Sequence, residues 1–163
     1  MSTITSPTDS RIPAWLRPYW HPGILLAALD GVGLAIAGYL AFVELRGEVP
    51  TCAIARGCET VANSSYSRID GIPVAVFGVI LSITLMALAL AWWRTNRQSL
   101  LLAHYALSFV GVAFEGYFTY LELFVIGAVC MWCALYAISL LARFVLTLVV
   151  WLRRDRYTSS VSN

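Results

Sequence analysis

AVCMWCALYAISLLARFVLTLVVW, residues 128–151, is an apolar run whose single charged side chain is Arg143. A transmembrane helix needs about 20 mostly apolar residues. The run is therefore predicted to cross a membrane as one helix. A Cys-x-x-Cys motif, Cys130 to Cys133, lies at its start.

The composition of the whole chain agrees with a membrane protein. Of its 163 residues, 60% are hydrophobic and 12% are charged, whereas soluble domains have about 45–50% apolar and about 25% charged residues. The basic residues are eleven arginines, scattered along the chain, and the net charge is only +2. This composition excludes an ordinary soluble globule, and no nucleic acid is expected as a partner.

Three more apolar stretches precede the run 128–151 in the chain, at residues 24–43, 72–93 and 100–126. Gly127 is the predicted turn between the last two spans. The fold class expected is an all-α membrane protein, a bundle of four transmembrane helices. The membrane domain is predicted over residues 24–152, with an outer loop at 44–71 and tails at 1–23 and 153–163.

The arginines orient this bundle, because cytoplasmic segments of membrane proteins are enriched in Arg and Lys. Seven arginines fall in the tails and the 94–99 loop, and three fall on the other side. Both termini are therefore predicted to be cytoplasmic, with loop 44–71 and the Gly127 turn outside. The two groups are Arg11, Arg17, Arg94, Arg97, Arg153, Arg154 and Arg156, against Arg46, Arg56 and Arg68.

Ionisable residues inside the spans need partners. Asp30 and Arg143 lie about 9 and 12 Å from the cytoplasmic side at 1.5 Å per residue, so they are expected to pair. Glu115, in the outer half of its helix, is either a proton relay or a neutral buried acid. His104 is placed on the cytoplasmic side. Small-residue helix contacts are expected at Gly31, Gly33 and Gly38.

All four cysteines fall on the outer side of the predicted bundle. Cys52 and Cys58 lie in the loop, and Cys130 and Cys133 share one face at the start of the fourth helix. The dipole at a helix N-terminus favours thiolate, which is the attacking species in disulfide exchange. Thiol–disulfide chemistry outside the cytoplasm is the favoured interpretation, because disulfides persist there.

Three other interpretations of the cysteines stay open from the residues alone. Four thiols are compatible with one zinc ion, although no histidine is expected on the same side. Two static structural disulfides are another possibility. A non-enzymatic four-span scaffold or metal-handling membrane protein is the third.

Several motifs resemble one family. Loop cysteines are followed by Cys58-Glu-Thr-Val-Ala-Asn-Ser64-Ser-Tyr, then by Gly71-Ile-Pro-Val-Ala-Val-Phe77-Gly, and then by Tyr120-Leu-Glu-Leu-Phe leading into Cys130-Met-Trp-Cys133. Together they resemble the bacterial members of the vitamin K epoxide reductase family, over about residues 24–150.

The resemblance implies a quinone-dependent protein-disulfide oxidoreductase in the bacterial cytoplasmic membrane, crossing it several times with its cysteines outside. Such a protein oxidises a thioredoxin-like (DsbA-like) partner and passes electrons to a membrane quinone. Cys52 and Cys58 would be the shuttle pair, and Cys130 and Cys133 the pair beside the quinone. The chain ends without a thioredoxin-like domain, so the partner is expected to be a separate protein.

Ser64 matches a serine that the family has near the redox centre. Candidates for contact with the quinone, chosen by depth, are Val74, Phe77, Phe114, Trp132 and Tyr136. Vertebrate members have asparagine at the position of Val74 and tyrosine at the position of Ala137. These departures favour a respiratory quinone, ubiquinone or menaquinone, over an epoxide. The alternative enzyme class is the unrelated disulfide-bond-forming protein B type of quinone-linked oxidase.

Overall fold

The structure, a computed structural model, describes residues 22–52 and 57–161, with side chains described through Arg153. Within these ranges four helices are long and apolar enough to cross a membrane. They are α1 (Pro22–Leu45), α3 (Val74–Thr95), α4 (Gln98–Tyr120) continued by the π-helix η2 (Leu121–Ile126), and α5 (Met131–Val161). The predicted all-α four-helix membrane fold is confirmed.

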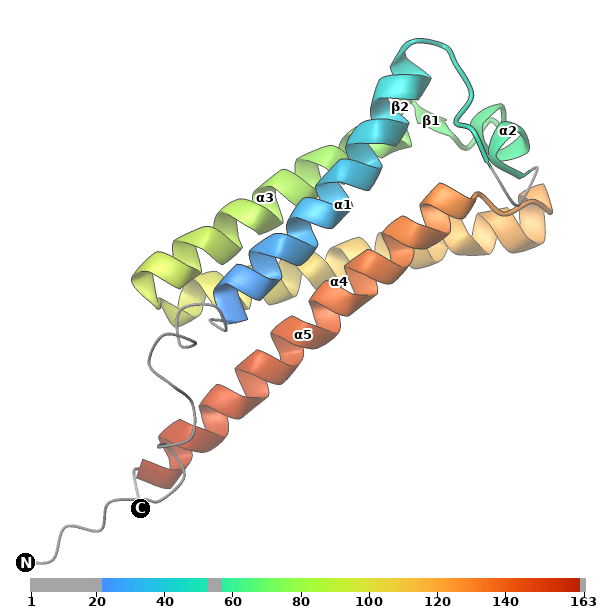
Figure 1. The fold of residues 1–163 in the computed structure, drawn as a ribbon. Coiled ribbons are helices and arrows are strands. Elements are labelled where there is room, and N and C mark those ends of the chain that lie inside the picture. Colours follow the sequence, from blue (N-terminus) through green and yellow to red (C-terminus); the bar gives the residue numbers. More distant parts are fainter. Residues whose placement is uncertain (1–21, 53–56, 162–163) are drawn as a thin grey trace, which may run out of the picture.

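The helices form a ring in which α1 contacts α3 and α5, and α4 contacts α3 and α5. The start of α1, the α3–α4 connection and the end of α5 lie at one end of the bundle (Figure 1). At the other end lie the short helix α2 (Gly57–Ala62) and the start of α5. A hairpin of two-residue strands, β1 (Arg68–Ile69) and β2 (Ile72–Pro73), leads from α2 into α3.

Three predicted spans differ from the observed helices by two residues or fewer at each end, and the fourth differs more. Gly127 is the turn, as predicted, with the left-handed φ of 69° that glycine adopts without steric cost. Residues 127–130 form no regular secondary structure, so α5 begins at Met131 and not at Ala128. Cys130 therefore precedes the helix, and only Cys133 lies within it.

A layer of polar side chains lies inside the bundle between two apolar clusters. The cluster near the start of α1 is formed by Leu26, Ala89, Trp92 and Leu101, and the other by Ala37, Leu85, Tyr136 and Leu140. Burial of apolar side chains on both sides shields the polar layer from water. Its members are Asp30, Ser82, His104, Ser108, Arg143 and Thr147.

The predicted pair of Asp30 and Arg143 is present in this layer. The Nη1 atom of Arg143 donates a hydrogen bond to Asp30 Oδ1 at 3.3 Å, and both side chains are fully buried. His104, expected on the cytoplasmic side, lies in the same layer, with its Nε2 atom 3.1 Å from Asp30 Oδ2 inside the bundle. Six residues separate His104 from the start of α4, a distance of about 9 Å along the helix, which places its ring below the bundle surface.

One of the three expected glycine contacts is confirmed. A Cβ at Gly33 would lie 2.7 Å from an Arg143 guanidinium nitrogen, so any larger residue there would displace this guanidinium. Gly31 and Gly38 have nothing within 4 Å of their Cβ positions, so the prediction for them is wrong. The small residue is needed where a large buried cation crosses the α1–α5 contact.

Candidate active site

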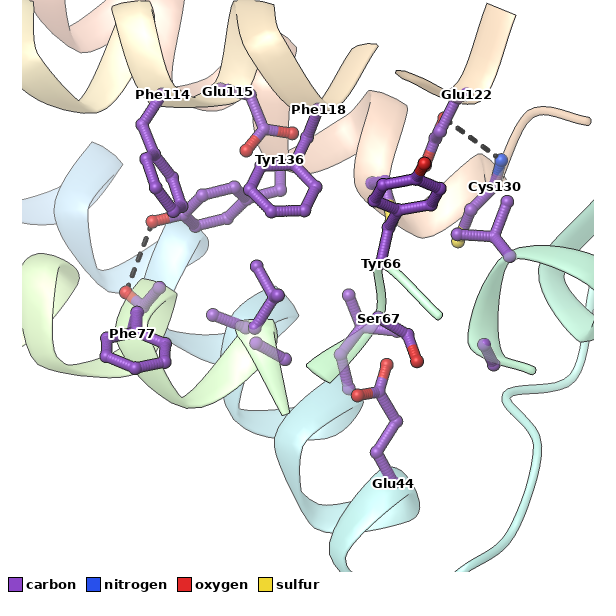
Figure 2. Close-up of a pocket in the computed structure, with 18 of the residues that line it drawn as sticks. Glu44, Tyr66, Ser67, Phe77, Phe114, Glu115, Phe118, Glu122, Cys130 and Tyr136 are labelled. Carbon is purple, nitrogen blue, oxygen red and sulfur yellow. Dashed lines mark hydrogen bonds between the residues drawn. The ribbon is translucent and has the colours of Figure 1, made fainter. Parts of the chain in front are cut away.

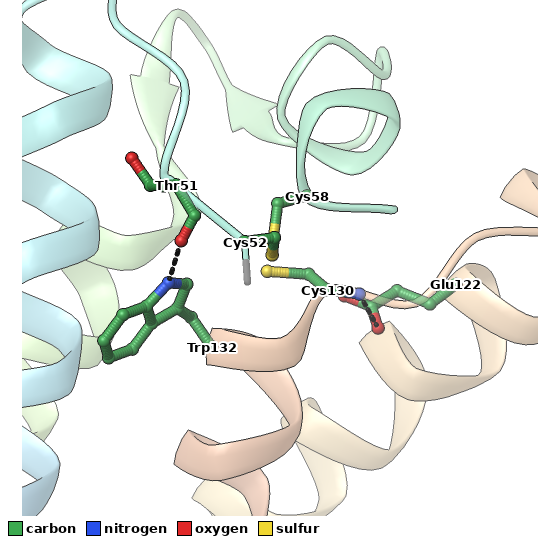
Figure 3. Close-up of a disulfide and its surroundings, with 6 residues drawn as sticks. All are labelled: Thr51, Cys52, Cys58, Glu122, Cys130 and Trp132. Carbon is green, nitrogen blue, oxygen red and sulfur yellow. Dashed lines mark hydrogen bonds between the residues drawn. A yellow bond between two sulfur atoms is a disulfide. The ribbon is translucent and has the colours of Figure 1, made fainter. Parts of the chain in front are cut away.

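The loop cysteines are joined in a disulfide at the end of the bundle where α1 ends and α5 begins (Figure 3). The Cα atoms of Cys52 and Cys58 are 6.1 Å apart, and Cys58, on α2, is buried. The Trp132 indole donates a hydrogen bond to the Thr51 carbonyl at 3.1 Å, which ties the loop to the start of α5. The side chain of Cys130 points toward this disulfide.

Cys130 is the capping residue of α5. Its carbonyl accepts the first helical hydrogen bond, from the Ala134 N–H at 3.0 Å. The backbone N–H groups of Trp132 and Cys133, the second and third residues of the helix, stabilise the charged form of its sulfur. This is the arrangement in which an N-cap side chain satisfies the free N–H groups of a helix start. The thiolate therefore replaces the oxygen acceptor that serine or aspartate supplies elsewhere.

These contacts stabilise the charged form of Cys130. The hydrogen bond from the Cys133 thiol lowers the pKa of Cys130 below its ordinary value, and the two backbone N–H groups lower it further. Burial and the charge of the Glu122 carboxylate oppose the shift but do not cancel it. Cys130 is therefore the thiol of the pair that ionises more readily. Because thiolate is the attacking species in disulfide exchange, Cys130 is the better nucleophile of the two.

The rate of Cys130 alkylation should reveal this lowered pKa. Because only thiolate reacts, iodoacetamide should modify Cys130 in the reduced pair at a lower pH than it modifies an ordinary cysteine. Cys133→Ala removes the largest cause and should move the half-maximal rate to higher pH, whereas Cys133→Ser, which keeps a donor, should move it less. Peptide mass spectrometry across a pH series measures the rates. An unchanged profile in Cys133→Ala would contradict this assignment.

Below the disulfide lies a cavity of about 300 Å³ with mainly apolar walls (Figure 2). Five of the six residues predicted to contact a quinone line it: Ser64, Val74, Phe77, Phe114 and Tyr136. Cys58, Cys130 and Cys133 also line it. The size and the mixture of aromatic walls with a few polar groups fit a small-molecule site. The Ser64 hydroxyl is occupied locally, since it donates to the Val61 carbonyl at 2.7 Å.

Trp132 does not line this cavity. Its ring packs against Tyr39 of α1, with the centroids 4.7 Å apart, and its N–H faces the loop. Successive residues of an α-helix are separated by about 100° around its axis, so residues three apart share a face and Trp132 points elsewhere. The residues of α5 that face the cavity are Cys133, Tyr136 and Leu140, and Cys130 precedes them at the same spacing.

Two carboxylates face the cavity on the side of α4. Glu115, flagged by the sequence, lines it near Tyr136, as Figure 2 shows. Glu122, on η2, accepts a hydrogen bond from the Cys130 backbone N–H at 3.3 Å and lines the cavity together with Cys133. Glu122 was not among the site residues expected from the sequence, although an acidic residue in an apolar span is itself a signal of function.

A second hollow, called the outer hollow below, adjoins the disulfide and is formed by the loop after α1 and by α2. It is lined by Val49, Pro50, Cys52, Cys58 and Glu59. Cys52 lines only this outer hollow, while Cys130 and Cys133 line only the inner cavity. Cys58 lines both, and therefore connects the two sites. In residues 22–52 and 57–161, no group of three or more His, Cys, Asp or Glu side chains could hold a metal ion.

Close backbone contact holds α2 on the start of α5. A Cβ at Gly57 would overlap the Val129 carbonyl oxygen and lie 2.8 Å from the Val129 nitrogen. Backbone atoms do not move aside as a flexible side chain does. Glycine at position 57 therefore permits the approach that brings Cys58 toward Cys130.

Replacing Gly57 by alanine should separate these two cysteines. Displacement by about 1 Å can slow a reaction between positioned groups on the order of 10²-fold. The rate of disulfide formation between Cys58 and Cys130, followed by peptide mapping, should fall by that factor in Gly57→Ala. Gly116→Ala is the matched control, since nothing lies within 4 Å of its Cβ position on α4. Equal rates in the two variants would refute the role of the Gly57 contact.

Comparison with known families agrees with this geometry. The model of the vitamin K epoxide reductase family matches residues 24–148, which is more than half of the chain. The matched range contains all four cysteines, the loop between α1 and α3, and the cavity-facing part of α5. The match separates the chain from the disulfide-bond-forming protein B class that the sequence left as an alternative. The chain belongs to the vitamin K epoxide reductase family of membrane oxidoreductases.

Proposed function

We propose that this protein oxidises a thioredoxin-like (DsbA-like) protein outside the bacterial cytoplasmic membrane and passes the electrons to a membrane quinone. The carrying observation is that Cys58 lines both the outer hollow and the inner cavity. A protein partner needs access to a thiol at the surface, whereas a lipid-soluble acceptor needs a site in the bilayer. The loop pair meets the first requirement, and the Cys130–Cys133 pair beside the cavity meets the second.

The first exchange takes place at the loop disulfide. A thiolate of the reduced partner attacks Cys52, which is less buried than Cys58, and Cys58 leaves as thiolate. The second partner thiol then displaces Cys52, so that the partner is oxidised and the loop pair carries two electrons. Each step is a thiolate attack through a mixed disulfide.

The second exchange moves the electrons inward. Cys58 attacks Cys130 of an oxidised Cys130–Cys133 pair, Cys133 leaves, and Cys52 then displaces Cys130 to restore the loop disulfide. The loop disulfide and the two free thiols in the structure correspond to the state after this exchange. The orientation of Cys130 toward the disulfide supports the sequence of steps (Figure 3).

The last step reduces the quinone. Cys130 and Cys133 form a disulfide, and two electrons and two protons reduce the quinone to the quinol, so the step balances. Glu122 lines the cavity together with Cys133 and is placed to accept its proton. The 300 Å³ cavity, with Phe77 and Phe114 in its walls, accommodates a quinone ring, ubiquinone or menaquinone.

The amide variant Glu122→Gln should test the role of the carboxylate. Loss of a general base typically slows proton transfer by 10²–10⁴-fold, so quinone reduction should slow by about 10²-fold. Quinone absorbance after mixing with the reduced protein gives the rate. Glu59→Gln, an exposed residue of α2, should behave as wild type. A normal rate in Glu122→Gln would exclude Glu122 as the base.

The function is tested by complementation and by reconstitution. The gene should restore disulfide formation in a bacterium that lacks its own oxidase. Purified protein should consume a reduced thioredoxin-like substrate and quinone in equal amounts. A scaffold or metal-handling protein would consume neither. Alkylation of the loop thiols by a membrane-impermeant reagent in intact cells would test the proposed orientation, with the cysteines outside and both termini in the cytoplasm.

A further inference from the structure

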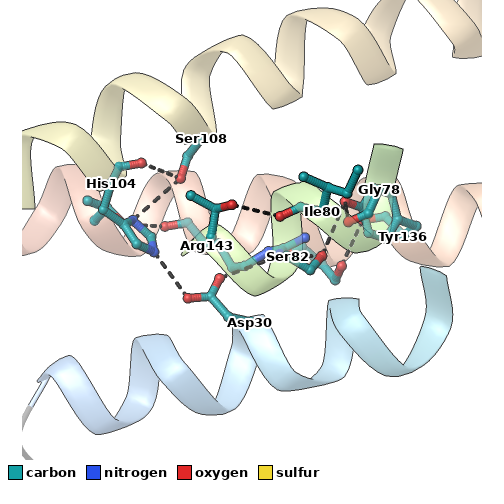
Figure 4. A network of polar contacts seen from close by, with 11 residues as sticks. Asp30, Gly78, Ile80, Ser82, His104, Ser108, Tyr136 and Arg143 are labelled. Atoms are coloured by element: carbon teal, nitrogen blue, oxygen red, sulfur yellow. Dashed lines mark hydrogen bonds and ion pairs between the residues drawn. The ribbon is translucent and has the colours of Figure 1, made fainter. Parts of the chain in front are cut away.

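A chain of hydrogen bonds connects the polar layer to the wall of the cavity (Figure 4). Arg143 Nη1 lies 3.5 Å from Ser82 Oγ, and Ser82 Oγ lies 3.3 Å from the Tyr136 hydroxyl. The Tyr136 hydroxyl lies 3.1 Å from the Gly78 carbonyl oxygen. Tyr136 lines the cavity, so a buried cation is linked through one serine to a phenol at the site.

The direction of this chain is fixed by the chemistry of its ends. A guanidinium only donates hydrogen bonds and a backbone carbonyl only accepts them. Ser82 therefore accepts from Arg143 and donates to Tyr136, and Tyr136 donates to the Gly78 carbonyl. Each bond polarises the next in the same sense, which strengthens the last donor in a medium of low dielectric constant.

The cation at the start of the chain is rigidly held. Arg143 is fully buried, and its Nε donates to the Ser139 carbonyl at 3.3 Å while Nη1 donates to Asp30. The guanidinium carbon lies 5.5 Å from the centre of the Tyr136 ring. The Asp30 carboxylate also contacts His104, so it interacts with two side chains, Arg143 and His104. Among the described residues, Arg143 Nη2 has no hydrogen-bond partner.

We propose that Arg143 is a positioning residue for quinone reduction, acting on the substrate through Ser82 and Tyr136. This inference rests on the proposed function. The Tyr136 O–H turns from the Gly78 carbonyl to a carbonyl oxygen of the bound quinone, while Ser82 continues to donate to the phenol oxygen. The donor stabilises the negative charge that develops on that oxygen as electrons arrive from Cys130 and Cys133, the role of an oxyanion-hole donor.

Ser82→Ala tests the relay, because it removes the middle link and leaves Arg143 with Asp30. The reaction divides into two measurable halves. Oxidised protein mixed with a reduced thioredoxin-like substrate, without quinone, reports the cysteine exchanges. Reduced protein mixed with saturating ubiquinone or menaquinone analogue reports quinone reduction. Ser82→Ala should slow the second half about tenfold and leave the first unchanged.

A double-mutant comparison separates the relay from general damage to packing. Removal of an oxyanion donor costs about 10²–10³-fold, so Tyr136→Phe should slow quinone reduction by about 10²-fold. Ser82→Ala combined with Tyr136→Phe should be no slower than Tyr136→Phe alone, because the serine acts only through the phenol. Ser108→Ala is the matched control. That hydroxyl lies on the His104 side of the polar layer, and its loss should change neither half.

The outcomes are distinguishable. Additive effects of the two substitutions, or equal slowing of both halves by Ser82→Ala, would overturn the relay. Normal quinone reduction by Ser82→Ala would also overturn it while leaving the proposed function intact. Wild-type protein that consumes no quinone would refute the proposed function together with the inference.

Discussion

Cys58→Ser should abolish quinone reduction by a protein partner but not by a small dithiol. Cys58 is the cysteine that lines both hollows, so its loss leaves no thiol path from the outer surface to Cys130. Turnover with a reduced thioredoxin-like protein should fall by at least about 10³-fold, as expected when one member of an interdependent set is removed. Dithiothreitol, which is small enough for the cavity, should still support quinone consumption.

The comparison of the two reductants is the internal control, since both use the same quinone site. Quinone absorbance measures both reactions. Equal loss with protein and dithiothreitol would mean that Cys58 maintains the fold rather than carries electrons.

A trapping experiment adds direct proof. Oxidised Cys52→Ser/Cys133→Ser protein should contain a Cys58–Cys130 disulfide, and Cys58→Ser/Cys133→Ser protein should form its Cys52–Cys130 counterpart at least tenfold more slowly.

Asp30→Leu should cause the largest loss of stability in the bundle. Removing one partner of a buried ion pair typically costs about 3–5 kcal/mol, because the other charge remains buried without compensation. Asp30→Leu leaves the Arg143 cation without its carboxylate. Arg143→Leu should cost less, because Asp30 keeps His104 at 3.1 Å. Unfolding of the purified protein by SDS titration in mixed micelles measures both losses.

The double variant provides the decisive test. Asp30→Leu/Arg143→Leu replaces the pair by apolar side chains and should recover most of the stability, since buried pairs replaced together are often neutral. Arg94→Leu, an exposed arginine at the end of α3, should leave stability unchanged. Independent, additive losses from Asp30 and Arg143 would contradict the pairing. The double variant should also be folded yet slow in quinone reduction, because the cation of the relay is gone.

Much of the fold could be predicted from the sequence because a bilayer imposes simple constraints. Spans of about 20 apolar residues, a single glycine between two of them and charges at matching depth were sufficient to locate the helices, the Gly127 turn and the Asp30–Arg143 pair. Depth along the membrane normal is a one-dimensional quantity, and residue counting measures it well.

Rotation about each helix axis could not be predicted in the same way. Trp132 has the depth of the site but faces α1, and His104 has a position near the helix start but faces the interior. Glu122 reaches the Cys130 N–H from a π-helix, whose extra residue per turn changes which side chains face inward. Hydropathy does not reveal such a turn, because every residue of η2 except Glu122 is apolar.

The sulfur cap on α5 has an energetic consequence for the redox balance of the Cys130–Cys133 pair. The N–H groups of Trp132 and Cys133 stabilise Cys130 only while it is a thiolate, so they favour the reduced form of the membrane pair. Stabilising the reduced form raises a reduction potential, by about 30 mV for each 1.4 kcal/mol in a two-electron couple. The start of one helix thus makes the Cys130–Cys133 pair a stronger oxidant than the same pair would be without these N–H groups.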